Sequence, residues 1–453
     1  MKRGLEAAAV LVLFLAGAAF RYKLVSHWVF AGSDSYGYVK IADELSVRHH
    51  FALAPPPAPL YWARLPLYPL FIAAVGGNTT LGNIQWLRIE YAQLIVDLCG
   101  SGLLAWAVAR RLAGKLAGLL ALALVMLYPI TALFVATALT ETLAMTLTLA
   151  AIAPLVLMTS HWRFFFSGAV VGIATLLRAD SILLAVAPAV AILSQPDHRL
   201  RAGWLVLAGF ALAFAPWPVR NLMQFGKPHL FGAHLSRFSQ PVDHSSGYWN
   251  WLRTWGKDWV AFSTPQACFY DSDCALSAAD LSAYGAFRHA DDSTAVAQLL
   301  ARRAAKGSAQ EISDGFAALA QARIRRQPLR TLLWLPLQRA SHMWVSLHDE
   351  VLQNPDWIPW PKVMRQLRKS FGLLSGILVF ALLLSAAALL LQKNTRHAAR
   401  LLVVPIAVRT LFLGWSGYCM PRYATEAMVL GFVLIAWFIA SVPLIAGAPG
   451  SRR

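Results

Sequence analysis

Apolar segments long enough to cross a lipid bilayer recur along the whole chain, and they constrain its fold more than any other feature. One helical crossing of a hydrocarbon core of about 30 Å needs about 20 apolar residues. Hydrophobic residues make up 58% of the 453 residues, charged residues 14%, and the mean hydropathy is +0.53, which exceeds what a soluble domain of this size carries. The apolar segments lie near residues 4 to 22, 89 to 109, 115 to 134, 138 to 159, 164 to 177, 180 to 194, 202 to 219, 371 to 391, 400 to 416 and 426 to 446. We therefore predict an all-α polytopic membrane protein with about 10 transmembrane helices.

The basic residues lie in alternate short loops between these segments. The formal net charge of +18 is therefore explained by the positive-inside rule and needs no nucleic-acid partner. The apolar run after Met1 lacks a convincing cleavage site, so it is read as a retained first helix. We expect a multi-pass protein of a bacterial cytoplasmic membrane with both termini in the cytoplasm. The basic residues that set this orientation are Lys2, Arg3, Arg110, Arg111, Lys115, Arg163, Arg199, Arg201, Lys393, Arg396, Arg400, Arg452 and Arg453.

The fifth and sixth segments are too short to cross a bilayer. Each has about 14 residues, which gives about 21 Å of helix. Their shared turn, Arg178-Ala179-Asp180, should lie below the outer surface, where charge is tolerated only if it faces protein or water. The alternative is one tilted helix of about 30 residues, which would invert every later loop and is disfavoured by the charge rule.

Two long segments fall on the non-cytoplasmic side. Residues 1–220 form a transmembrane module with a first external loop at 23–88, residues 221–370 form an external domain, and residues 371–453 hold the last transmembrane helices. The first loop contains an amphipathic helix from Tyr36 to Arg48 with Lys40, Asp43 and Glu44 away from its apolar face. A short juxtamembrane segment follows it at residues 64–74.

The external domain is predicted to be small and mostly helical. A helix begins at Asp292, and Ser308 with Glu311 forms a capping-box pattern for the next one. Trp249 and Trp251 suit either stacking on a sugar or the lipid interface. Cys268 and Cys274, with five residues between them, suggest a disulfide in an oxidising exterior. No cysteine or histidine spacing is typical of a metal site, and no cofactor is predicted.

Several short motifs follow one another in a fixed order along the chain. They are Asp34 before an amphipathic helix, Arg64 with Pro66-Leu67-Tyr68-Pro69, Thr140-Glu141, Leu177-Arg178-Ala179-Asp180, Pro216-Trp217-Pro218-Val219-Arg220-Asn221 and Pro421-Arg422-Tyr423. This ordered set resembles the GT-C glycosyltransferases, most closely the protein O-mannosyltransferases and the lipid A aminoarabinose transferases. The similarity covers residues 1–225 and, more weakly, 400–430. The protein-mannosylating branch has an acidic pair in its first loop, whereas here Asp34 is followed by Ser35, so the acceptor class stays open.

The resemblance implies transfer of a sugar from a polyprenyl-phosphate carrier to a glycan, lipid or protein at the periplasmic face, with inversion. Such a reaction needs a base for the acceptor hydroxyl and cations for the departing phosphate. Asp34 is the candidate base, or alternatively a helix N-cap. The candidate phosphate ligands, which are alternatively interfacial arginines, are Arg64, Arg178, Arg220 and Arg422.

Several further residues are candidates for supporting roles. Glu141 can favour a helix N-terminus, Asp180 can orient Arg178, and Tyr423 can pack beside its arginine neighbour. His244 is a candidate acceptor contact. Two other functions stay open, a transporter or flippase for lipid-linked sugars and a non-catalytic glycolipid-binding protein, although transporters tend to show two related halves and this chain does not.

Overall fold

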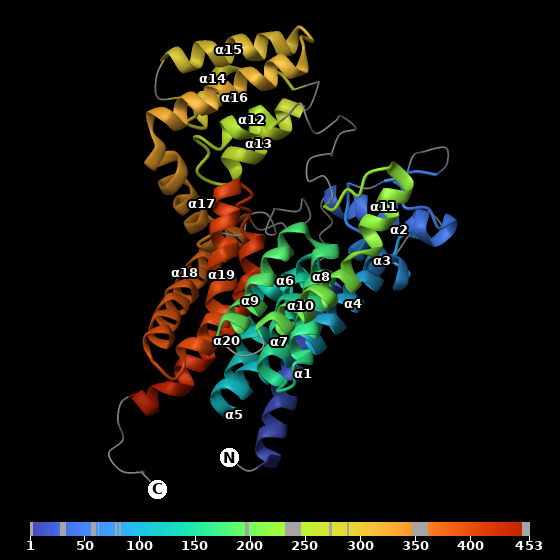
Figure 1. Ribbon diagram of the computed structural model, residues 1–453, viewed down its shortest axis with the longest axis vertical. Coiled ribbons are helices and arrows are strands. Elements are labelled where there is room, and N and C mark those ends of the chain that lie inside the picture. The colour runs from blue at the N-terminus through green and yellow to red at the C-terminus, as the bar shows by residue number, and fades with distance from the viewer. Residues whose placement is uncertain are drawn as a thin grey trace. The chain divides into compact units, whose positions relative to one another are not determined.

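The computed structural model describes residues 3–27, 33–55, 60–61, 63–77, 79–80, 83–194, 199–231, 246–270, 274–287, 290–346 and 361–445. The chain forms two compact units (Figure 1). Unit 1 comprises residues 1–232, 349–409 and 425–453, and unit 2 comprises residues 233–348 and 410–424. Helices α19 (Arg396–Ser416) and α20 (Arg422–Ile445) contribute residues to both units.

In the residues that the structure describes, the regular elements of unit 1 are helices apart from one hairpin of two-residue strands, β1 (Thr79–Thr80) with β2 (Asn83–Ile84). Besides its parts of α19 and α20, its helices are α1 (Arg3–His27), α2 (Ser33–Arg48), α3 (Leu67–Ala74), α4 (Trp86–Val96), the π-helix η1 (Asp97–Gly102), α5 (Leu103–Leu127), α6 (Pro129–Val135), α7 (Glu141–Leu157), α8 (Trp162–Leu177), the 3₁₀-helix η2 (Ala179–Ala185), α9 (Val186–Leu193), α10 (Arg199–Phe214), α11 (Pro216–Phe225) and α18 (Pro361–Leu391).

Five helices in the described part of the chain are long and apolar enough to cross a membrane, or six if the bent pair α10 and α11, at 49° to each other, counts as one span. Three shorter apolar helices add to them, at Glu141–Leu157, Trp162–Leu177 and Ala179–Leu193. The all-α polytopic class is confirmed, while the expected count of ten is not. The five long spans are Gly4–Ser26, Trp86–Leu127, Arg368–Leu391, Arg396–Ser416 and Arg422–Val442.

The longest of these spans is interrupted at Ala113 and Gly114. Gly114 has φ +83° and ψ −172°, a conformation that essentially only glycine adopts. The break falls between the apolar segments expected at residues 89 to 109 and 115 to 134. Its position explains why a single 42-residue helix was not expected from the sequence.

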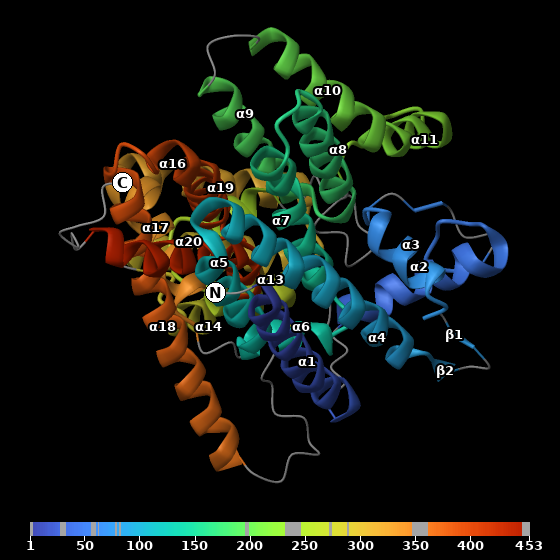
Figure 2. The same cartoon turned by 90° about the horizontal axis from the view of Figure 1, so that it is seen from below.

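Helix α8 ends at Leu177, and Arg178 is extended, with φ −147° and ψ 128°. The alternative of one continuous helix through this region is therefore wrong. Helices α8 and α10 pack side by side (Figures 1 and 2) with their backbones in close approach, because a Cβ on Gly168 would lie only 2.2 Å from the Val206 carbonyl oxygen, and one on Gly209 only 2.1 Å from that of Phe165. Small residues permit such contacts between helices.

Helix α2 begins at Ser33, three residues before the expected start. Ile41 and Ala42 are fully buried, as the amphipathic pattern predicts. Glu44 was expected to point away from the apolar face of this helix, but it is buried, with only 5% of its surface exposed. Its carboxylate pairs with Arg48 at 2.9 Å, which compensates part of the cost of burying a charge.

Unit 2 is an aromatic-rich helical domain, and most of its residues come from the segment predicted to be external. Its core contains Tyr248, Trp251 and Phe316, all fully buried. The structure contains the disulfide between Cys268 and Cys274, whose Cα atoms are 5.1 Å apart. Its helices are α12 (Ser246–Leu252), α13 (Trp259–Tyr270), α14 (Ala278–Ala283), α15 (Ala290–Ala304), α16 (Ala309–Arg326), the π-helix η4 (Arg330–Trp334) and α17 (Leu335–Trp344).

Two sets of hydrogen bonds stabilise unit 2. The Ser308 hydroxyl accepts from the Glu311 amide at 3.4 Å, which is the forward half of the expected capping box. Arg339, only 1% exposed, donates to the carbonyl oxygens of Gly256 at 2.7 Å and Gly414 at 3.2 Å and also to that of Arg253. Burial lowers the pKa of Arg339 to about 10.

Candidate functional site

The first candidate element in unit 1 is an ion pair between Asp34 and Arg64. The Arg64 Nη2 donates to the Asp34 Oδ1 at 2.8 Å, and the two side chains are 28% and 14% exposed for the arginine and the aspartate. Because α2 begins at Ser33, Asp34 lies in the first helical turn. Its charge still suits a helix N-terminus.

Tyr38 joins this pair to the interior of unit 1. The Arg64 Nη1 donates to the Tyr38 hydroxyl at 3.4 Å, and the Tyr38 ring meets that of Tyr68 edge to face at 4.9 Å. Burial raises the pKa of Tyr38, and the charges that act on its hydroxyl include Arg178 and Glu141. The ion pair and these two more deeply buried residues therefore influence the same tyrosine.

A second element is a buried network of two guanidinium groups and three carboxylates. The Arg178 Nε lies 3.2 Å from Asp180 Oδ1 and 3.3 Å from Glu426 Oε1, and its Nη1 lies 3.6 Å from Glu141 Oε1. The Arg409 Nη2 lies 2.7 Å from Asp180 Oδ2 and 2.5 Å from Glu426 Oε2. None of the five side chains is more than 9% exposed.

The local structure explains why these groups meet. Arg178 interrupts the helical path between α8 and η2, so its side chain leaves the helix surface. Glu141 opens α7, and the preceding Thr140 hydroxyl accepts from Arg178 Nη1 at 3.1 Å. Arg409 and Glu426 lie inside the apolar helices α19 and α20. Five ionisable groups in an apolar interior are stable only as a mutually paired set.

This network differs from the arrangement expected for Arg178. From the sequence, Arg178 was expected to bind a phosphate together with Arg422. In the structure the second guanidinium beside Arg178 is that of Arg409, and the intervening anions are carboxylates of the protein. Arg422 belongs to unit 2, where its guanidinium carbon lies 5.4 Å from the ring centroid of Tyr423.

Arg409 and Glu426 join the buried network but were not candidates from the sequence. Each is a charged residue within or at the start of an otherwise apolar segment, and such residues are functional candidates because burying a charge in a membrane helix is costly. That signal was present at residues 400 to 416 and 426 to 446.

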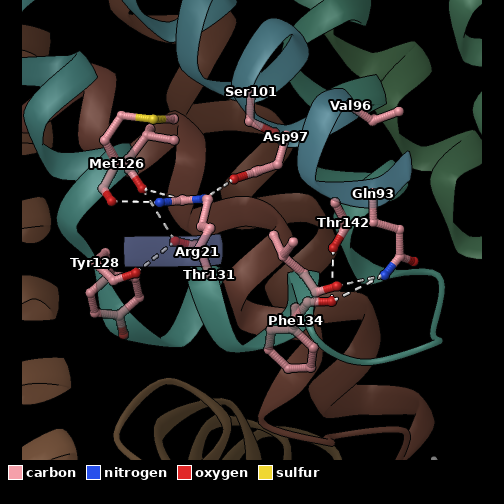
Figure 3. A network of polar contacts seen from close by, with 12 residues as sticks. Arg21, Gln93, Val96, Asp97, Ser101, Met126, Tyr128, Thr131, Phe134 and Thr142 are labelled. Carbon is pink, nitrogen blue, oxygen red and sulfur yellow. Dashed lines mark hydrogen bonds and ion pairs between the residues drawn. The ribbon is translucent and has the colours of Figure 1, made fainter. Parts of the chain in front are cut away.

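A hydrogen-bonded amide fixes the chain that leads into Glu141. The Gln93 side-chain nitrogen donates to the carbonyl oxygens of Val135 at 3.0 Å and Thr137 at 2.8 Å. Beside it, the Thr142 hydroxyl donates to the Phe134 carbonyl oxygen at 3.0 Å (Figure 3). The Gln93 oxygen accepts from the Tyr68 hydroxyl at 2.8 Å. The same glutamine thus holds the tyrosine beside Tyr38 and the segment before α7.

A fully buried arginine, Arg21, holds α1 against η1 and α5 close by (Figure 3). Its Nε donates to Asp97 Oδ2 at 2.6 Å, and its other nitrogens donate to the carbonyl oxygens of Met126 at 2.5 Å and Val125 at 2.9 Å. Neither Arg21 nor Asp97 was a candidate from the sequence. Their contacts are those of a structural pair.

Arg220 is half-buried and surrounded by aromatic rings. Its Nη1 donates to the Asn221 side chain at 2.7 Å and to the Tyr61 carbonyl oxygen at 3.1 Å. Its guanidinium carbon lies 5.1 Å from the Trp217 ring and 5.4 Å from the Phe51 ring. Arg220 therefore packs against protein groups in this structure, and its role as a phosphate ligand or as an interfacial arginine stays a prediction.

The tryptophans of unit 2 are core residues. Trp251 is fully buried and Trp249 is 7% exposed; the Trp249 Nε1 donates to the Ser416 carbonyl oxygen at 3.1 Å. The predicted sugar or lipid contact is therefore wrong for both, because their faces are covered by protein. Tyr423 is 8% exposed, and His244 lies outside the described residues.

Metal coordination has no support among the side chains that the structure describes, where no group of three His, Cys, Asp or Glu residues could hold an ion. The three carboxylates of the buried network face guanidinium groups instead.

Comparison with known proteins gives two similar structures. No protein-family model and no curated protein match the chain. It is similar to the crystal structure of ArnT from Cupriavidus metallidurans bound to undecaprenyl phosphate, with 16% sequence identity and a TM-score of 0.40 over 98% of this chain and 78% of that chain. It is also similar to ArnT from the same organism in the apo state, with 16% identity and a TM-score of 0.42 over 95% of this chain and 78% of that chain.

Proposed function

We propose that this protein is a membrane glycosyltransferase of the GT-C type that transfers a sugar from a polyprenyl-phosphate carrier to an acceptor at the periplasmic face, with inversion. One observation carries the proposal. Four of the motif groups that resemble this family, which are far apart in the sequence, form two ion pairs, Asp34 with Arg64 and Glu141 with Arg178. Tyr38, which contacts the first pair, packs in one hydrophobic cluster with Leu143 and Leu177, which are close in sequence to the second pair. Convergence of these residues is what a shared site requires.

Asp34 is assigned as the general base. Its side chain is 14% exposed, more than the carboxylates of the buried network, so an acceptor hydroxyl can reach it. Its carboxylate takes the proton as the acceptor oxygen bonds to the anomeric carbon. The bond from that carbon to the phosphate oxygen breaks, and its electron pair leaves with the lipid phosphate. Attack from the face opposite the phosphate inverts the anomeric centre.

Arg64 is assigned to the departing phosphate, which gains one negative charge in this step. A guanidinium group has five donors in a planar fork, and Asp34 accepts from only one nitrogen of Arg64. Arg64 is also the most exposed member of the two charged elements. A cation placed where charge develops stabilises the transition state.

Arg178 is assigned to positioning. Its guanidinium faces Glu141, Asp180 and Glu426, so a phosphate would have to displace a carboxylate to reach it. The network instead fixes the start of α7 and the turn after α8 beside Tyr38. A rigid second layer of this kind holds reacting groups in place.

Substitution of the base tests the proposal. Asp34→Asn retains size and hydrogen bonding but cannot accept the proton, so we expect a loss of about 10² to 10⁴ in rate with near-normal thermal stability. The assay is sugar transfer from a synthetic polyprenyl-phosphate donor in nanodiscs. Asp43→Asn on the same helix is the matched control and should retain activity.

The outcome also separates the alternatives. Full transfer by Asp34→Asn would remove this residue from the mechanism. Movement of the donor lipid across a proteoliposome membrane without cleavage of its sugar–phosphate bond would instead support a transporter or flippase.

A further inference from the structure

An open groove of about 770 Å³ lies between α1 and α5 in unit 1. One wall consists of apolar side chains, Val10, Leu11 and Phe14 from α1 and Leu103 from α5. Leu11 is 58% exposed. The wall continues along α1 from Glu6 to Phe14, which is about 12 Å at 1.5 Å per residue. This surface suits a hydrocarbon chain.

The other end of the groove is charged. The Arg110 Nε donates to Glu6 Oε1 at 2.6 Å, and the Lys115 Nζ lies 3.2 Å from Glu6 Oε2. Because the helix breaks at Gly114, Lys115 and Arg110 both contact the carboxylate of Glu6. The two cations are 43% and 37% exposed for arginine and lysine, whereas the Glu6 side chain is only 8% exposed.

The charge at this end is complementary to an anion. The charged residues that line the groove are two cations and one carboxylate, with a net charge of +1, and both cations are partly exposed to solvent. An apolar wall that leads to accessible cations matches one amphiphile, with a hydrocarbon chain in the groove and a phosphate at Arg110 and Lys115. Basic pockets between transmembrane helices bind anionic lipid head groups in this way.

The groove is separate from the Asp34 site. Asp34 follows the end of α1 at His27, whereas Glu6 lies near the start of this helix. About 32 Å of helix rise separates Glu6 from His27, which is close to the thickness of a hydrocarbon core. The charged end of the groove therefore faces the leaflet opposite the proposed reaction.

We propose that this groove is a binding site for an anionic membrane phospholipid. The lipid bridges α1 and α5 and neutralises the remaining positive charge beside Glu6. The polyprenyl phosphate of the proposed reaction is a different ligand, which would bind at the other end of α1.

Native mass spectrometry of the purified protein with added phosphatidylglycerol or phosphatidylcholine tests the site. We expect saturable binding of phosphatidylglycerol and weaker binding of the zwitterionic lipid. Arg110→Gln with Lys115→Gln should weaken phosphatidylglycerol binding by about ten-fold or more. Ala7→Trp, at an exposed position in the groove, should block the site without a change of charge.

Two further variants make the result specific. Glu6→Gln removes the carboxylate that competes with the lipid phosphate for Arg110 and Lys115, so it should strengthen phosphatidylglycerol binding. If these three residues only hold α1 against α5, the same change should lower thermal stability without strengthening lipid binding. Lys393→Gln with Arg396→Gln, both at exposed positions in another basic loop, is the matched control and should bind like the wild type. Thermal unfolding verifies that each variant is folded.

Several outcomes would overturn the proposal. These are equal binding of the two lipids, wild-type binding by both the charge variant and Ala7→Trp, or equal loss in the Lys393 and Arg396 control. Undecaprenyl phosphate should not displace phosphatidylglycerol if the proposal is right. If it does, and if the groove variants weaken its binding to the same extent, the groove binds the polyprenyl phosphate and the phospholipid is the wrong occupant.

Discussion

The two charged elements of unit 1 use the same residue types at different degrees of burial. Asp34 and Arg64 form a one-to-one pair that is 14% and 28% exposed, while the buried network sets three carboxylates against two guanidinium groups. An accessible pair can exchange its partner for a ligand at little cost in stability. A buried network cannot, because each lost partner leaves a charge without compensation. Accessibility therefore separates a group that can react from groups that hold it in place.

The largest expected effect comes from removing one cation of the buried network. Arg409→Gln leaves three carboxylates facing Arg178 alone, and breaking a buried ion pair costs about 3 to 5 kcal/mol. We expect a marked fall in the thermal unfolding temperature in detergent. Arg400→Gln, at an exposed position on the same helix, is the control and should change stability by less than about 0.5 kcal/mol. Equal stability of the two variants would show that the network is not structurally important.

A smaller effect tests whether the network acts as one unit. Arg178 and Arg409 share the carboxylates of Asp180 and Glu426, so Arg178→Lys and Arg409→Lys should show a coupling energy of about 0.5 to 3 kcal/mol. A double-mutant cycle on the free energy of unfolding measures it. Arg64→Lys combined with Arg409→Lys should be additive, because Arg64 does not contact the shared carboxylates. Additivity in both cycles would contradict the assignment of a shared network.

The smallest effect on stability is expected at the pair of Asp34 and Arg64. A change there should mainly reduce turnover. Arg64→Lys retains the charge and loses the planar fork, so we expect transfer to fall by about ten-fold, or 1.4 kcal/mol in the barrier, with stability changed by less than about 1 kcal/mol. Donor titration should show the loss in kcat as well as in KM. An equal loss of stability and activity would place Arg64 with the structural arginines.

The sequence predicted some of these features from local rules. The break at Arg178 followed from two apolar segments that are each too short to span, and the structure has an extended residue there. The disulfide followed from close spacing in a segment predicted to be external. Both depend on residues that are near each other in the chain.

Features that depend on long-range packing were less predictable. Nothing local pairs Arg64 with Asp34, 30 residues away, or joins Arg178 to Arg409 through two shared carboxylates. Trp251 was misassigned because aromatic residues suit a sugar site, a lipid interface and a protein core equally well on composition. Only the packing of unit 2, which covers this side chain completely, separates these environments.

The contact between α8 and α10 bears on how inactive variants of this protein should be interpreted. Gly168 and Gly209 allow the two backbones to touch, and Arg178 lies at the end of the same α8 helix. A methyl group at either glycine would push the helices apart and carry that end with it. Random mutagenesis scored for loss of transfer should therefore recover substitutions at these glycines, although neither bears a polar side chain. Inactive variants at these glycines would therefore reflect the distance between α8 and α10. They would not identify residues that contact a ligand.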